Sequence, residues 1–179
     1  MNAGTYSLYA LPCDCLGRNV NLTARLEAAT AQFGTHMLLS EFFTQELSPA
    51  ARRYCRLLDR VMVKGSAIPM ELWTFDISAF PRHFKEPIID QHGYQLPVDF
   101  ETDEEFKQLQ AGIDPRFFAY FKKGVDAYFA GRWMQAKASL ESALTFQTDG
   151  PAQTLIEFMR KTDFNAPSGW KGYRALTSK

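Results

Sequence analysis

The spacing of apolar residues changes character twice along this chain, and these changes limit what it can fold into. Residues 1–77 combine short alternating runs with helical stretches, a pattern typical of an α/β arrangement. Residues 78–112 show little periodicity and are broken by several prolines and a glycine. Residues 113–179 return to helical spacing. We therefore expect an α/β portion at 1–77, a linker or wrapping arm at 78–112 and a helical extension at 113–179.

The first half of the α/β portion predicts a strand, a turn and a helix. Residues 5–12 alternate loosely and end at a proline, as a short strand does before a turn. Gly17 then breaks the chain before a helix that we expect from about Asn19 to Phe33. Gly34 follows as a stop signal.

The second half predicts a strand, a helix and a β-hairpin. Residues 36–39 are too few for a helix and are placed like a strand. Ser48 and Pro49 open a helix as an N-cap followed by proline at the first helical position. Residues 60–75 form two alternating arms around Lys64-Gly65-Ser66, which indicates a hairpin. The expected fold class is α+β.

The helical extension predicts an antiparallel pair of helices and a third helix. Asp114-Pro115 starts the first helix, and Asp149-Gly150-Pro151 precedes the third. Gly124, Ala136 and Ala143 have the spacing of a tetratricopeptide hairpin, in which small residues let the two helices approach. One such hairpin cannot bury its own faces, so we expect it to pack on the α/β portion or on a partner.

Composition excludes several classes of protein. Lys plus Arg number 20 and Asp plus Glu number 20, so no basic excess points to nucleic acid. No apolar run is long enough for a transmembrane segment, and the N-terminus lacks the features of a secretory signal. Three cysteines are too few for a disulfide scaffold. We therefore expect an intracellular, reducing compartment, with the protein soluble or a peripheral part of a larger assembly.

The stretch CDCLGRNVNLTARLE, which begins at Cys13, admits three interpretations: a metal-binding cysteine pair, an ordinary helix start or half of a nucleotide site. Cys13 and Cys15 form an isolated pair, with Cys55 distant and the three histidines scattered, so zinc is disfavoured and packing is preferred. We expect no metal ligands in this chain.

The nucleotide interpretation depends on Asp14, Asn21 and Arg25. Asn21 and Arg25 are four residues apart, so they share one face of the expected helix in its first turns. A helix N-terminus also offers unpaired N–H groups and a positive dipole end, both suited to phosphate. The alternative is that an Asn and an Arg on an exposed helix face are simply solvated.

This stretch resembles the second half of the class III adenylate/guanylate cyclase catalytic domain. In that family an aspartate, two residues, a glycine and then V-N-x-x-x-R-L form a strand-to-helix segment. The matching residues here are Asp14, Gly17, Val20, Asn21, Arg25 and Leu26. Further similarity is found in segments 38–41, 60–65, 129–136, 149–151 and 169–172. The resemblance implies a partial ferredoxin-like domain (strand–helix–strand–helix–β-hairpin), followed by a helical hairpin extension.

The resemblance also implies roles. Asp14 would accept a hydrogen bond from the adenine amino group and favour ATP over GTP. Asn21 would orient the ribose. Arg25 would stabilise negative charge at the α-phosphate while the 3′-oxygen attacks, which a planar guanidinium does well. The product would be cyclic AMP.

The family reaction also uses two metal ions held by a pair of aspartates, and this chain begins after the segment that carries them. We therefore expect it to be inactive alone and to need its missing N-terminal half or a protein partner. Mg²⁺ or Mn²⁺ is expected only with that completing half. The alternative is a catalytically dead structural or docking subunit of a larger assembly, favoured by Ser66 where many relatives place lysine. An accidental motif in a plain α+β protein is the third possibility.

Overall fold

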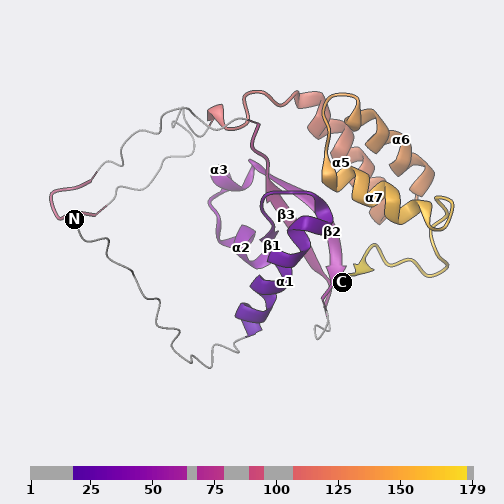
Figure 1. Ribbon diagram of the computed structural model, residues 1–179, viewed down its shortest axis with the longest axis horizontal. Helices are drawn as coiled ribbons and strands as arrows, with labels where there is room; N and C mark the ends of the chain where they lie inside the picture. Colours follow the sequence, from indigo (N-terminus) through magenta and orange to yellow (C-terminus); the bar gives the residue numbers. More distant parts are fainter. Residues whose placement is uncertain (1–17, 64–67, 79–88, 95–106, 177–179) are drawn as a thin grey trace, which may run out of the picture.

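The computed structural model describes residues 18–63, 68–78, 89–94 and 107–176 (Figure 1). Helices and a four-stranded mixed sheet give an α+β architecture. In chain order the elements are α1 (Arg18–Phe33), β1 (Leu39–Ser40), α2 (Glu41–Glu46), α3 (Pro49–Arg52), β2 (Cys55–Met62), β3 (Met70–Phe75), α5 (Pro115–Phe129), α6 (Trp133–Leu144), α7 (Gly150–Arg160) and β4 (Arg174–Ala175). The expected strand at 5–12 lies outside the described residues.

The strands are arranged in the order β1-β3-β2-β4. β2 and β3 pair antiparallel, which confirms the predicted hairpin, although its turn lies outside the described residues. β4 pairs parallel with the end of β2 and was not predicted. The strand expected at 36–39 is wrong for most of its length, because β1 comprises only Leu39–Ser40. The carbonyl of Met37 instead accepts a hydrogen bond from the Thr74 side chain at 2.8 Å.

A β-bulge at Leu58 shifts the alternation of β2. Leu57 lies opposite Trp73, whereas Asp59 lies opposite Leu72, so Leu58 is an extra residue on this strand. As a result Leu58 and Asp59 are both fully buried although they are neighbours. β2 begins at Cys55, five residues before Arg60, where the sequence pattern placed the start of the hairpin's first arm.

Helix starts in the α/β portion follow local capping. α1 spans nearly the range predicted, and Gly34 after it has a φ of 60°. Ser48 caps α3 by accepting from the N–H of Ala51, with proline at the first helical position, as predicted. α2 was missed, although Ser40 caps it by accepting from the N–H of Phe43.

Helices α5, α6 and α7 lie together beside the strands (Figure 1), which confirms the three helices expected in the extension. The side chains of Asp114 and Asp149 cap α5 and α7 by accepting hydrogen bonds from backbone N–H groups of the first turn. Both helices also have a proline in that turn. α5 and α6 approach closely at Gly124: a Cβ built there would lie 2.7 Å from the Cγ of Leu140. The small residue is therefore what permits this helix pair.

Replacing Gly124 by alanine is expected to lower the free energy of unfolding by about 1–3 kcal/mol, because Leu140 is fully buried and cannot move aside freely. The higher helix propensity of alanine, about 1 kcal/mol, offsets part of this loss. Urea unfolding measures the effect. The control is Gly112→Ala, whose Cβ meets only the exposed Ser78 side chain. A Gly124→Ala variant as stable as the wild type would contradict the close-packing interpretation.

The extension packs on the α/β portion, which is one of the two arrangements expected for an incomplete repeat. Buried residues of β2 and β3 form one apolar cluster with those of α1, α5, α6 and α7. Trp170 docks the tail: its indole N–H donates to the carbonyls of Tyr128 and Phe129 at 3.0 and 3.2 Å. Ser78 and Leu109, near the two ends of the expected arm, are hydrogen-bonded at 2.7 Å.

Within the described ranges, no helix is both long enough and apolar enough to cross a bilayer.

Candidate functional site

The predicted nucleotide residues are only partly described. α1 places positions 21 and 25 one turn apart, as the spacing predicts. Leu26, Ala29 and Phe33 bury the inner face of this helix, and the side chain of Arg25 is exposed. Asp14 and the side chain of Asn21 lie outside the described residues. The structure therefore brings two of the three positions onto one helix.

The described part of the chain contains no cluster of side chains that would support the metal-binding interpretation. There, no group of three or more His, Cys, Asp or Glu side chains is placed to hold a metal ion. Cys13 and Cys15 are outside the described residues. Cys55 is half-buried, and burial raises the pKa of its thiol above the ordinary value. This thiol is therefore protonated and weakly nucleophilic at neutral pH.

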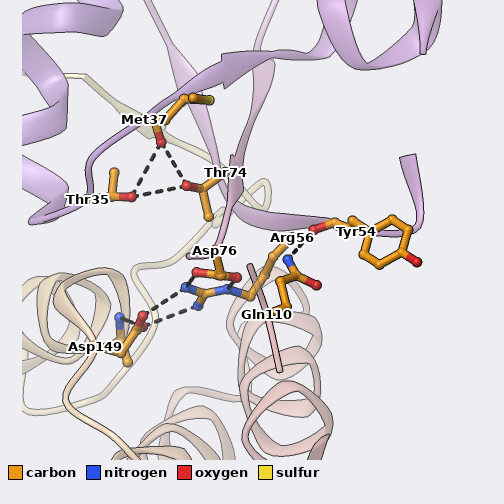
Figure 2. A network of polar contacts seen from close by, with 9 residues as sticks. Thr35, Met37, Tyr54, Arg56, Thr74, Asp76, Gln110 and Asp149 are labelled. Carbon is orange, nitrogen blue, oxygen red and sulfur yellow. Dashed lines mark hydrogen bonds and ion pairs between the residues drawn. The ribbon is translucent and has the colours of Figure 1, made fainter. Parts of the chain in front are cut away.

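A buried ionic network that the sequence analysis missed joins the sheet to the helical extension. Arg56 of β2 donates from Nε to Asp76 at 2.7 Å and from Nη2 to Asp76 at 2.6 Å. Its Nη1 and Nη2 also donate to the two carboxylate oxygens of Asp149, at 3.2 and 2.8 Å. Figure 2 shows the guanidinium held between the two carboxylates.

Burial makes this network energetically important. The side chains of Arg56, Asp76 and Asp149 are 7%, 12% and 6% exposed. Burial favours loss of the proton from Arg56, but its hydrogen bonds to Asp76 and the charges of both carboxylates outweigh this and raise the pKa. The guanidinium also lies over the rings of Phe117 and Phe121, at 4.9 and 4.1 Å. Arg56 is thus a permanent cation.

Asp149 has two roles in this arrangement. Its Oδ2 accepts from the N–H of Ala152 at 2.8 Å and so caps α7. The same carboxylate pairs with Arg56 on β2. Asp149 thereby fixes the start of α7 to strand β2 and links the helical extension to the sheet.

A second buried pair anchors the tail. Asp59 is fully buried, and its Oδ2 accepts from the Nε of Arg174 at 2.7 Å. The guanidinium of Arg174 lies 5.3 Å from the ring of Phe33 and 4.9 Å from that of Phe158. Burial raises the pKa of Asp59, and the positive charge of Arg174 opposes that rise. The pair holds β4 against β2.

Tyr128 lies beside this pair. Burial and the negative charge of Asp59 both raise the pKa of its hydroxyl, so the phenol is neutral across the physiological range. Among the described residues, the Tyr128 hydroxyl and the Nη2 of Arg174 are buried without a hydrogen-bond partner of good geometry.

Comparison with protein-family models, with curated proteins and with solved structures found no match for this chain. The class III cyclase resemblance therefore rests on the sequence motifs described above.

Proposed function

We propose that this chain is the C-terminal portion of a class III nucleotidyl cyclase catalytic domain, continued by a helical extension. The observation that carries the proposal is helix α1 (Arg18–Phe33), on which positions 21 and 25 lie one turn apart. The elements that follow are a short strand, two short helices and an antiparallel hairpin. This order supports part of a ferredoxin-like cyclase domain.

In the proposed reaction, Asp14 accepts from the adenine amino group and Asn21 orients the ribose of ATP. The 3′-hydroxyl passes its proton to water and its oxygen bonds to the α-phosphorus, while the bond from that phosphorus to the bridging oxygen breaks and releases pyrophosphate. Arg25 stabilises the charge that develops on the α-phosphoryl oxygens. The exposed position of the Arg25 side chain on α1 supports this role.

The family reaction also depends on two divalent ions, Mg²⁺ or Mn²⁺. The described residues do not fit such a centre, because they bring no three metal-ligating side chains together. We assign no metal-dependent step to them and expect the ions to be held by the completing half.

The test is a chimera in which the metal-binding half of a class III cyclase domain precedes residue 1. With ATP and Mn²⁺ it should produce cyclic AMP, and Arg25→Ala should lower kcat about 100-fold, as loss of a transition-state donor does. KM for ATP should change much less. Arg132→Ala, which removes an exposed guanidinium from the helical extension, is the matched control and should be within about twofold of the parent.

Equal activity of the parent and Arg25→Ala chimeras would contradict the assignment. A folded chimera that makes no cyclic nucleotide would favour the alternative, a structural or docking subunit. A specific observation favours that alternative: Phe42 and Phe43 on α2 are 66% and 52% exposed, and adjacent exposed aromatics are typical of a surface that a partner covers.

A further inference from the structure

A cavity of about 580 Å³ lies between the sheet and α5. It is lined by the first residues of β2, by Trp73 of β3 and by one side of α5. None of the residues of α1 lines it, so it is separate from the proposed nucleotide site. Its volume is in the range of cavities that hold small organic molecules, about 300–1,000 Å³.

The walls of this cavity are mainly apolar. Leu57 and Trp73 are opposite each other on paired strands and contribute from the sheet. Phe118, Phe121 and Val125 contribute from α5. An apolar or aromatic body would be accommodated by these walls, because it replaces water against side chains that gain nothing from hydration.

The charged groups at the cavity leave one cation available. Lys122 is paired with Asp126 at 2.6 Å, and Arg56 is paired with two carboxylates. Arg53 contacts the ring of Tyr54 at 5.5 Å, and among the described residues it forms no ion pair. A single free guanidinium suits a monoanion, and its planar fork matches a carboxylate.

A buried donor also lacks an acceptor. Trp73 lines the cavity, and its indole Nε1 is buried without a hydrogen-bond partner among the described residues. Leaving such a donor unpaired in the protein interior is unfavourable. By contrast, the indole groups of Trp133 and Trp170 both donate to the carbonyl of Tyr128.

From these contacts we propose that the cavity binds a small organic monocarboxylate with an aliphatic or aromatic body. The carboxylate pairs with Arg53, and the apolar body lies against Trp73 and Phe118. The ligand would contact both β2 and α5, and so bridge the α/β portion and the helical extension. This site goes beyond the proposed cyclase function and does not depend on it.

The test is calorimetric titration of the 179-residue chain with octanoate, octanol and octyltrimethylammonium, which share the apolar body and differ in charge. Octanoate is expected to bind at least tenfold more tightly than the other two compounds. Arg53→Gln should remove this preference. Lys161→Gln, which removes an exposed cation outside the cavity, is the matched control and should leave it unchanged.

An NMR titration localises the binding independently of any variant. The chain has three tryptophans, so three indole N–H resonances report on three places. Octanoate should shift the resonance of Trp73 and leave those of Trp133 and Trp170 in place. Absence of saturable octanoate binding, equal binding of octanol, or shifts confined to the other two indoles would overturn the proposal.

Discussion

Replacing Arg56 by methionine is expected to lower the free energy of unfolding by about 3–5 kcal/mol, as removal of one member of a buried ion pair does. The change keeps most of the side-chain volume over Phe117 and Phe121 but leaves the buried Asp149 and the largely buried Asp76 without their common cation. Urea unfolding, followed by circular dichroism at neutral pH, measures the loss.

The control is Arg60→Met, which breaks a pair with Glu71 whose members are 42% and 20% exposed. Because solvent screens that pair, its loss should amount to about 1 kcal/mol or less. Adding Asp76→Asn and Asp149→Asn to Arg56→Met should recover part of the stability, since no charge is then buried and asparagine still caps α7. Equal losses in the two arginine variants would contradict the importance assigned to the network.

Arg174→Met is expected to cost a similar amount, about 3–5 kcal/mol, because Asp59 is fully buried and loses its only charged partner among the described residues. The loss should depend on pH. Burial already raises the pKa of Asp59, and without Arg174 the pKa of the folded state rises further. A raised carboxyl pKa contributes stability below the unfolded value, near 3.9, and loses it as pH rises through the folded value.

The deficit of Arg174→Met should therefore be smallest near pH 4 and largest at neutral pH. Unfolding curves between about pH 4 and pH 7.5 test this sign. Asp59→Asn in the same chain should remove the pH dependence, while its side-chain oxygen can still accept from the N–H of Arg60. A deficit independent of pH would show that the charge of Asp59 is not its source.

The elements that sequence predicts well are those specified by adjacent residues. The caps at Ser48, Asp114 and Asp149 each have a proline one or two residues later, and each marks the start of a helix. The close approach at Gly124 follows from the spacing of small residues. These helix starts depend only on neighbouring residues, so they can be predicted without knowledge of the tertiary structure.

The extent of β2 could not be predicted, for two physical reasons. Arg56 and Asp59 are charged residues on the buried side of the strand, which hides the expected alternation. The bulge at Leu58 then shifts the alternation of buried and exposed residues along β2 by one position. The partners that make these charges tolerable, Asp149 and Arg174, are 93 and 115 residues away in sequence. No local pattern connects them.

The candidate site divides in the same way. The one-turn spacing of Asn21 and Arg25 was predicted from sequence alone, because it depends only on the helix. The cavity between the sheet and α5 was not predicted, because its lining residues come from distant segments of the chain. Cavities of this kind require the packed structure before they can be recognised.

The pairing of β4 with β2 has a consequence for synthesis on the ribosome. Asp59 emerges well before Arg174, so a growing chain has no counter-ion for this carboxylate until the tail is made. Closing a contact over so long a stretch is also entropically unfavourable and slow. A chain that ends before residue 174 therefore lacks the counter-ion of the buried Asp59 carboxylate, and we expect it to be less stable than the chain that carries Arg174.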